Sequence, residues 1–459
     1  MIIEPNNISY RDTAARVVKK ESEYYRYIFY EYKAEYDHLM QSGLYKELTQ
    51  KDLLIKHQEI QIDTDDPKVY KLLYPTQITY QSYPFEWSYS QWRKAIYAYL
   101  RINHIALKYG MILKDATPFN FYLTMGKAVM FDTSSFMFFN NGDKWIAYKQ
   151  FCSEFLGPVT LMHYNGQKWA RLTQTHLRGL PLTFISKQLP IKSWFHLNTL
   201  LHIHLHAKYT FKKVIKRHSK NNGFSIDKIS SLFEIILSGL RCWTKPYQFT
   251  IHWFGYYQND IESNKYLIHK EQVITTWLEK LAPNTVVDLG ANTGKFSFIA
   301  GRIAKKVIAL EADDACVDGI ESEIYKQCIN NISATVMDLA ESTSNIGLLN
   351  KEIKSIYTRT QSDVVLALAI VHHLKISDQL SFKQIAELLA VYTRKFAIVE
   401  FVPKSDNKVQ LLLKDKTFNF SDYTEDKFIN ALLEWFTINE VVILQDSERT
   451  LFLLEKIKS

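Results

Sequence analysis

The chain has 459 residues, a formal net charge of +8, and hydrophobic and aromatic fractions of 47% and 14%. This length predicts two domains, and the composition supplies enough apolar residues to fill two cores. No run approaches the roughly 20 apolar residues of a membrane-spanning helix, and residues 1–6 lack the basic start and apolar stretch of a signal peptide. We therefore expect a cytoplasmic protein whose four cysteines, which lack metal-type spacing, are buried thiols.

In the first half of the chain, a predicted hinge at 80–87 leads into a helix from Ser90 to about Tyr109. Apolar residues recur along this helix at the spacing of one buried face, and Asn103 and His104 interrupt that face near its end. The apolar positions are Trp92, Ile96, Leu100 and Leu107. The pattern predicts an amphipathic helix.

Three polar residues follow this helix. Asp115 and Asn120 stand five positions apart, and Asp132 follows a predicted strand-turn-strand around residues 125–126. Their spacing resembles the catalytic loop and metal-binding acid of protein kinases and related small-molecule kinases. The resemblance implies that Asp115 orients a hydroxyl, while Asn120 and Asp132 hold magnesium on a nucleotide such as ATP.

This kinase-like pattern has clear departures. There is no Gly-rich phosphate loop before residue 80, Leu113-Lys114 stands where His-Arg is expected, and Asp132 is followed by Thr-Ser instead of Phe-Gly. Turn chemistry is the alternative explanation of the three polar residues, since Asp and Asn cap loops by bonding their own backbone.

A basic cluster at residues 208–220, followed by Asn-Asn-Gly at 221–223, is interpreted as a domain boundary. A solvated helix end explains the cluster most simply, and contact with RNA or anionic lipid is the alternative. Just upstream, His202 and His206 would share one face of a helix. Because no glutamate of an H-E-x-x-H motif and no third ligand stands nearby, a partly buried helix is favoured over a metal site.

The most informative stretch of the second half is residues 286–297, where a short apolar strand ends at Asp288 and a loop carries Gly290 and Gly294. Glycine lets the backbone turn sharply and approach a ligand where a Cβ would collide, and the following helix presents unpaired N–H groups and its positive dipole end. The next strand, 306–310, closes with Glu311, about 20 residues past the loop, where a carboxylate can accept both ribose hydroxyls of an adenosine. Together these features predict a nucleoside-binding site.

The glycine spacing distinguishes two kinds of nucleoside site. Dinucleotide enzymes prefer G-x-G-x-x-G, whereas this loop reads G-x-x-x-G with an aspartate two residues before the first glycine. The segment resembles the first motif of class I S-adenosylmethionine-dependent methyltransferases. That resemblance implies S-adenosyl-L-methionine as the cofactor. The implied cofactor-binding residues are Asp288, Gly290, Asn292, Gly294, Glu311 and Asp338.

Asp338 ends a predicted third strand at 334–338, where relatives hold the adenine amino group; a loop residue or helix cap is the alternative. Further strands are predicted at 363–370, 396–402, 436–438, 441–444 and 450–454, and they alternate with helical spans such as 313–329 and 381–394. This alternation is typical of a doubly wound α/β domain.

Three more polar residues are placed at the carboxyl edge of this sheet, where open α/β sheets bind their ligands. His372 and His373 follow the strand 363–370, and Glu400 lies at the tip of the next strand. Either histidine acts as a base on an attacking hydroxyl or amine, or both rings are structural, since methyl transfer needs mostly in-line positioning. Glu400 is expected to bind a polar acceptor or a cation.

Taken whole, the chain resembles the large two-part bacterial methyltransferases related to the nodulation protein NoeA. The resemblance lies in residues 83–88, 113–120, 131–133, 367–374, 400–404 and 449–451, besides the Asp288 loop. The expected fold class is α/β, with a C-terminal, doubly wound, seven-stranded Rossmann-like methyltransferase sheet preceded by an α+β, kinase-like N-terminal domain. The predicted domain ranges are 1–222, a connector at 223–260, and 261–459.

The predicted function is transfer of a methyl group from S-adenosylmethionine to an oxygen or nitrogen of a small-molecule or glycan-like acceptor. The alternative is a nucleotide-binding regulatory or phosphotransferase module in residues 1–222, with the methyltransferase-like domain as its partner. Nucleic acid is not expected as a partner.

Overall fold

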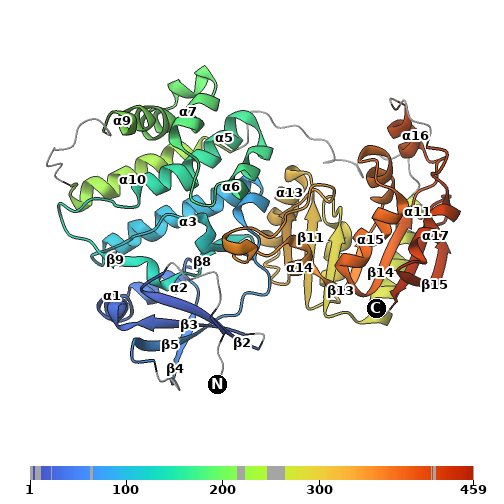
Figure 1. Ribbon diagram of the computed structural model, residues 1–459, viewed down its shortest axis with the longest axis horizontal. Helices are drawn as coiled ribbons and strands as arrows, with labels where there is room; N and C mark the ends of the chain where they lie inside the picture. The colour runs from blue at the N-terminus through green and yellow to red at the C-terminus, as the bar shows by residue number, and fades with distance from the viewer. Residues whose placement is uncertain are drawn as a thin grey trace. The chain divides into compact units, whose positions relative to one another are not determined.

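The computed structural model describes residues 4–5, 12–21, 23–61, 66–213, 223–244, 264–414, 416 and 420–457. The chain divides into two compact units (Figure 1). One unit takes in residues 1–250 and 346–353, and the other takes in residues 251–345 and 354–459. Residues 253–257, which read Trp-Phe-Gly-Tyr-Tyr, lie outside the described residues.

The N-terminal unit begins with a five-stranded antiparallel sheet in the order β1-β2-β3-β5-β4. Its strands are β1 (Glu4–Pro5), β2 (Ala15–Lys20), β3 (Glu23–Phe29), β4 (His57–Ile60) and β5 (Val69–Pro75), and between β3 and β4 lie η2 (Tyr30–Tyr32), α1 (Lys33–Gln41) and α2 (Leu44–Gln50). One face packs a small core in which Ile28 and Leu73 meet Tyr32 and Tyr36.

The rest of this unit is mainly helical and surrounds α3 (Tyr89–Leu107) (Figure 1). Its other elements are η3 (Pro84–Glu86), β6 (Met111–Leu113), η4 (Pro118–Asn120), β7 (Phe121–Thr124), β8 (Lys127–Met130), η5 (Thr133–Ser135), β9 (Phe136–Phe138), α4 (Tyr148–Gln150), the π-helical η6 (Phe151–Leu156), α5 (Gly157–Asn165), η7 (Gln167–Arg171), α6 (Leu172–Thr175), α7 (Leu182–Gln188), η8 (Ile191–Phe195), α8 (Leu197–Thr199), the π-helical η9 (Leu200–Leu205), α9 (His206–Lys213) and α10 (Ile226–Arg241). The strands form two small antiparallel pairs, β6 with β9 and β7 with β8.

Helix α3 confirms the predicted amphipathic helix. Ser88 caps its start by accepting a hydrogen bond from the Gln91 N–H, and the four predicted apolar positions are all buried. Asn103 interrupts the stripe for a structural reason: its amide group donates to the Tyr99 carbonyl, and its carbonyl accepts from the Leu113 N–H. The buried amide therefore ties α3 to the strand that leads into the Asp115 loop.

Two expectations about the first half need correction. Helix α10 falls in the predicted connector 223–260, yet its buried residues belong to the core of the N-terminal unit, so that unit extends beyond residue 222. The cysteines were expected to be buried, and Cys152 and Cys316 are, but Cys242 and Cys328 are exposed; all four are free thiols.

The C-terminal unit contains the expected seven-stranded sheet, in the order β12-β11-β10-β13-β14-β16-β15. Its strands are β10 (Thr285–Leu289), β11 (Lys306–Glu311), β12 (Ile332–Val336), β13 (Ser362–Ala367), β14 (Thr393–Phe401), β15 (Phe436–Ile443) and β16 (Thr450–Lys456). The first five pair in parallel and β16 runs antiparallel to both of its neighbours. The two runs predicted at 436–438 and 441–444 form the single strand β15, with a register shift between Ile438 and Glu440.

Helices connect the parallel strands, as the predicted doubly wound fold requires (Figure 1). The helical elements are α11 (Asn264–Leu281), α12 (Lys295–Gly301), α13 (Asp314–Lys326), η10 (Leu348–Asn350), α14 (Ile356–Thr360), the π-helical η11 (His373–Ser377), α15 (Phe382–Tyr392), α16 (Asn407–Leu413) and α17 (Glu425–Leu432). The direction in which strands are added reverses between β10 and β13. Open α/β sheets bind ligands at the carboxyl ends of the strands at such a reversal.

Residues 346–353 leave the C-terminal sheet between β12 and β13 and belong to the N-terminal unit. Ile346 and Ile353 pair as an antiparallel bridge, and Ile353 is buried against Tyr83 and Phe85, with Phe119 packed on the same cluster. We call these residues the arm. The arm completes an apolar cluster at the hinge segment before α3.

A buried ionic network joins α11 to the end of β14. The Glu400 carboxylate accepts hydrogen bonds from Lys270 at 2.5 Å and from the Tyr266 hydroxyl at 2.6 Å, and Arg449 donates to both Tyr266 and Asp406. Both Lys270 and Glu400 are almost fully buried. Burial alone would raise the pKa of Glu400, but Lys270 and Arg449 hold it below its usual value. The Glu400 carboxylate therefore binds within the protein and is not free to take a ligand.

Replacing one partner of this network should be far more damaging than replacing an exposed partner on the same helix. We expect Lys270→Met to lower the free energy of unfolding of the C-terminal unit by roughly 3–5 kcal/mol, because it leaves the Glu400 charge buried without a cation. The control is Lys280→Met, whose exposed pair with Glu440 should be worth at most about 1 kcal/mol. Urea denaturation measures both, and equal losses would contradict the expectation.

Candidate functional site

The loop after β10 turns through two glycines with positive φ, +74° at Gly290 and +84° at Gly294. A Cβ at Gly290 would lie 2.9 Å from the Ile370 side chain, and one at Gly294 would lie 2.8 Å from Ile320. No other residue fits either position without displacing a neighbour. The N–H groups of residues 290 and 291 both donate to the Leu310 carbonyl, so the loop crosses over the end of β11.

Glu311, the last residue of β11, reaches back to this loop. One carboxylate oxygen accepts the Asn292 N–H at 2.7 Å, and the other accepts the Asp313 N–H at 2.9 Å. Burial raises the pKa of Glu311, and the backbone N–H groups of Asp313 and Asn292 oppose that rise. Because an ionised carboxylate offers about four lone-pair sites, these two bonds leave acceptor capacity for a ligand's hydroxyl groups.

Asp288 is buried at the end of β10, and its carboxylate accepts a 2.6 Å hydrogen bond from the Ser297 hydroxyl on α12. Burial raises the pKa of Asp288 to about 6, although Ser297 and the positive charge of Lys270 lower it. A cationic ligand nearby would favour the ionised form. Ser297 and Lys270 were not predicted, since a serine early in a helix and a lysine in the preceding helix carry no local signal for a site.

The remaining predicted cofactor residues have local structural roles as well. Asn292 has φ +49°, and its side-chain carbonyl accepts the Thr293 N–H at 2.7 Å. Asp338 lies two residues beyond β12 and accepts the Ala340 N–H at 3.0 Å. That bond fits the loop residue considered as the alternative for Asp338, and it leaves the second carboxylate oxygen for other partners.

The two histidines follow β13, as predicted, with ring centroids 4.2 Å apart. His372 is fully buried, and within the described part of the chain neither of its ring nitrogens has a hydrogen-bond partner. Burial lowers the pKa of His372 well below its usual value and lowers the pKa of His373 to about 4. Both rings are therefore neutral near pH 7.

The structure also brings together the three polar residues of the N-terminal unit. The Ser135 hydroxyl donates to Asp132 at 2.7 Å and lies 3.4 Å from Asp115, and the Asn120 amide donates to Asp132 at 3.3 Å. Arg26 on β3 forms an ion pair with Asp132. The sequence analysis missed Arg26, which is 106 residues from its partner.

Arg26 neutralises the charge of one acid of this cluster, Asp132. Burial alone would raise the pKa of Asp132, but Arg26 and the hydroxyls of Ser134 and Ser135 lower it to about 2. Burial, together with the negative charge of Asp132, raises the pKa of Asp115. Among the described residues no group of three or more His, Cys, Asp or Glu side chains is placed to hold a metal ion. Of the predicted metal ligands, Asp132 pairs with Arg26, and Asn120 donates its amide to Asp132.

Two other features do not form a site. His202 bonds the Tyr148 hydroxyl at 2.8 Å and His206 stacks on the same ring, which fits a partly buried helix.

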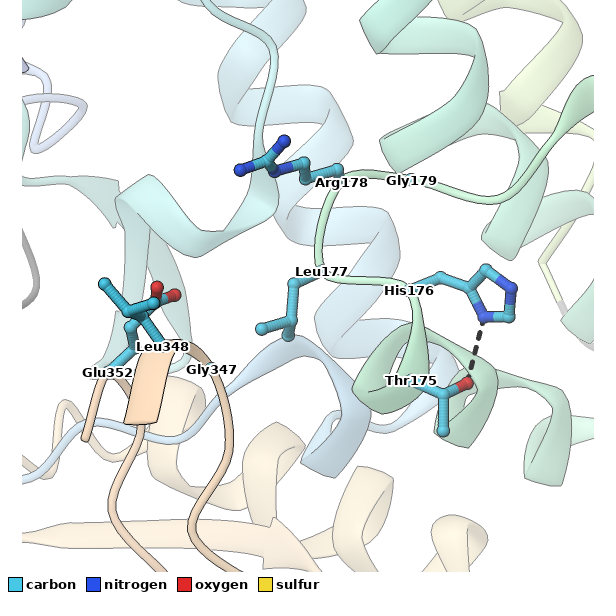
Figure 2. Close-up of a pocket in the computed structure, with 8 residues that line it drawn as sticks. All are labelled: Thr175, His176, Leu177, Arg178, Gly179, Gly347, Leu348 and Glu352. Atoms are coloured by element: carbon cyan, nitrogen blue, oxygen red, sulfur yellow. Dashed lines mark hydrogen bonds between the residues drawn. The ribbon is translucent and has the colours of Figure 1, made fainter. Parts of the chain in front are cut away.

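An open pocket of about 410 Å³ in the N-terminal unit is lined by residues 175–179 and by the arm (Figure 2). Its polar groups do not converge, because His176 turns away to bond Thr175 at 2.9 Å (Figure 2).

The sheet order, the glycine loop and the acids at the ends of β10 and β11 define the class of the C-terminal unit. Its strand order and register are those of the class I S-adenosylmethionine-dependent methyltransferase fold. The residues present fit S-adenosyl-L-methionine, because the Glu311 carboxylate keeps acceptor capacity beyond its two backbone hydrogen bonds and Asp288 adds a second buried acid at the neighbouring strand end.

Over most of its length the chain is similar to the nodulation protein NoeA of Rhizobium meliloti (strain 1021), with 27% identity over 384 residues, which cover 82% of this chain and 80% of that protein. No family profile matches the chain.

Solved structures similar to this chain include the N-methyltransferase NodS from Bradyrhizobium japonicum WM9, at 12% identity over 43% of this chain and 100% of NodS, with a TM-score of 0.33. Another is the magnesium protoporphyrin IX methyltransferase ChlM from Synechocystis PCC 6803, at 14% identity over 43% of this chain and 90% of ChlM, with a TM-score of 0.31. At such scores, the fold assignment rests on the strand order and register of this chain itself.

Because the pKa of Asp288 is raised, the pH dependence of the folding stability tests its environment. Because the folded state holds a proton up to about pH 6 that the unfolded state releases near pH 4, folding stability should fall as the pH rises through this window. Asp288→Asn removes the buried charge and keeps an acceptor for Ser297. We expect this variant to be more stable than the wild type by about 1–3 kcal/mol at about pH 8, with no advantage near pH 4.

Urea denaturation of the C-terminal unit at several pH values measures this difference. Ser297→Ala removes a bond that lowers the pKa of Asp288, so it should enlarge the pH dependence. If the free energy of unfolding of Asp288→Asn changes with pH in parallel with that of the wild type, the Asp288 carboxyl group is not the source of the pH dependence.

Proposed function

We propose that this methyltransferase transfers the methyl group of S-adenosylmethionine to an oxygen or nitrogen atom of a small-molecule or glycan-like acceptor. The observation that carries the proposal is the position of Glu311, whose buried carboxylate is fixed at the tip of β11 beside the glycine loop. A carboxylate at this point of a βαβ unit is placed to accept the ribose hydroxyls of a nucleoside. The proposed cofactor-binding residues are Asp288, Gly290, Asn292, Gly294, Glu311 and Asp338.

The bound cofactor supplies an electrophilic methyl group on a positively charged sulfur. Around it, Glu311 accepts from the ribose, Gly290 lets the backbone approach closely, and the buried carboxylate of Asp288 supplies negative charge that complements a cationic ligand. These residues orient the donor for in-line attack, which is the main requirement of the reaction.

The two histidines contribute less to proton removal than their position suggests. A general base works best with a pKa near the operating pH, whereas burial lowers the pKa of His373 to about 4. Burial also lowers the pKa of His372 well below its usual value, because its ring is enclosed. We therefore favour a structural role for His372 and His373, in which the neutral rings shape the carboxyl edge of β13 and the acceptor loses its proton to water.

Replacing Glu311 should weaken cofactor binding. Hydrogen bonds to charged groups are worth roughly 1.5–3 kcal/mol each, so Glu311→Ala is expected to weaken binding of S-adenosylhomocysteine by about tenfold or more per lost bond, measured by calorimetry. The matched control is Glu323→Ala on α13, whose exposed carboxylate bonds only Gln327 and Lys326 among the described residues. Unchanged affinity in Glu311→Ala would remove this residue from the site.

The acceptor can be sought without assuming its identity. Purified protein incubated with an isotopically labelled methyl donor and a metabolite extract should yield products that carry the labelled methyl group. Glu311→Ala should yield less of the same products, and Glu323→Ala should match the wild type. Label on a carbon-bound methyl group, with none on oxygen or nitrogen, would contradict the proposed acceptor class.

A second candidate function concerns the N-terminal unit. We infer that residues 1–222 have the arrangement of a nucleotide-binding regulatory or phosphotransferase module, with Mg-ATP as the ligand class. The observation in its favour is that Asp115, Asn120 and Asp132 lie together behind the antiparallel sheet. The observation against it is Arg26, whose guanidinium takes the place beside Asp132 that a magnesium ion would need.

Thermal shift with nucleotide decides between an active module and an inert scaffold. If the unit binds Mg-ATP, ATP with magnesium should raise the melting temperature of the wild type, and Asp132→Asn should abolish the shift because it removes a metal ligand. The control is Asp52→Asn, an exposed acid of the same unit that pairs with Lys127. No shift with ATP or GTP would leave the unit as a scaffold held together by Arg26 and Asp132.

A further inference from the structure

An exposed apolar patch lies on the helical part of the N-terminal unit. We call the residues 191–201 the knuckle, since they form η8, α8 and the start of η9. Phe195 and Ile191 are 87% and 81% exposed, the highest values among the large hydrophobic side chains that the structure describes. The knuckle's other exposed apolar residues are Trp194, Leu197 and Leu201. Contiguous exposed apolar surface of this kind marks an interaction site more often than chance.

The knuckle is held in place by its neighbours. The Trp194 ring stacks on His204 with a centroid distance of 4.1 Å and an angle of 5°. His204 in turn bonds the hydroxyls of Ser193 and Ser186, both at 2.8 Å, which ties η8 and α7 to the π-helical η9. Because Ser193 and His204 are buried, the exposed side chains between them are presented from a fixed backbone.

The lysines and arginines around the knuckle have no acidic residues among them in the sequence. Residues 155–226 contain eleven lysines and arginines and no aspartate or glutamate. This stretch alone carries more positive charge than the net +8 of the whole chain. In the described part of it, Lys192 is exposed within the knuckle, and Lys187 and Lys208 are exposed on the elements that flank it. A partner of this surface is therefore expected to be anionic.

We propose that the knuckle and its flanking lysines form a docking surface for the head-group region of an anionic lipid bilayer. Apolar and aromatic side chains enter the boundary between head groups and acyl chains, and lysines beside them are attracted by the negative surface. The aliphatic side chains of Ile191, Leu197 and Leu201 decide between lipid and nucleic acid, because they offer nothing to phosphates and do not stack on bases. No helix among the described residues is long and apolar enough to span a membrane, so the contact is with the surface.

The test is co-sedimentation of the full chain with vesicles. Vesicles of phosphatidylcholine alone are compared with an equal-parts mixture of phosphatidylcholine and phosphatidylglycerol. We expect the wild type to partition at least about tenfold more strongly to the anionic vesicles, and added salt to weaken this binding. The double variant Ile191→Ser with Phe195→Ser should lose most of the binding, and Lys187→Glu should weaken it.

The control is the double variant Leu411→Ser with Ile443→Ser, since each of these residues is 69% exposed in the C-terminal unit. It should bind as the wild type does. All the substituted side chains are exposed, so unchanged melting temperatures are expected and serve as the check on folding.

Several outcomes would overturn the proposal. One is a wild type that stays in the supernatant with anionic vesicles, and another is a knuckle variant that sediments like the wild type. Binding of single-stranded RNA that depends on Lys187 but not on Ile191 and Phe195, without vesicle binding, would assign the surface to nucleic acid. A wild-type dimer in light scattering that the knuckle variant dissociates, again without vesicle binding, would assign it to a second copy of the chain.

Discussion

The hydrogen bonds of the Glu311 carboxylate are the interaction on which the candidate cofactor site depends. It joins the tip of β11 to the Asn292 N–H in the loop after β10, so two neighbouring parallel strands present one continuous edge. The loop can follow this path only because Gly290 and Gly294 accept positive φ. Without either glycine the loop could not lie against β11, and without the carboxylate its backbone would lose the bond that fixes its height above the sheet.

The buried ionic network around Lys270 supports this edge. Lys270 lies between Glu400 and the ring of Phe296, 4.8 Å from that ring's centroid, and its charge acts on Asp288. The cation therefore connects the first helix of the unit with the two strand ends on either side of the reversal. A balanced ionic network in this position fixes geometry at the expense of stability, since buried ion pairs recover little of the free energy lost on leaving water.

The sequence predicted those parts of the molecule whose signal is local. Apolar runs, glycine spacing and an acid at a strand end are all read within a few residues, so the strands of the C-terminal sheet, the loop at Gly290 and the position of Glu311 followed from them. Helix α3 was found for the same reason. Its polar interruption at Asn103 needed the structure, because the partner of that amide is the backbone of residue 113.

The parts that sequence reasoning missed depend on partners far apart in the chain. Arg26 meets Asp132 across 106 residues, and Lys270 meets Glu400 across 130, and no periodicity links such pairs. Glu400 at a strand tip was expected to face a ligand because the pattern does not show that Lys270 and Tyr266 already bond its carboxylate. Likewise, α10 was assigned to a connector because its apolar face has no visible partner in the sequence.

The arm has a consequence for how the chain is made. Tyr83 and Phe85 leave the ribosome long before Ile353, yet the cluster that buries them includes that isoleucine. The N-terminal unit therefore cannot complete this cluster while residues 1–250 are being made, and must wait until about half of the second unit has been translated. For the same reason, a chain divided after residue 250 would leave Tyr83 and Phe85 uncovered in one fragment and Ile353 uncovered in the other. The two fragments would have to be expressed together to bury these side chains.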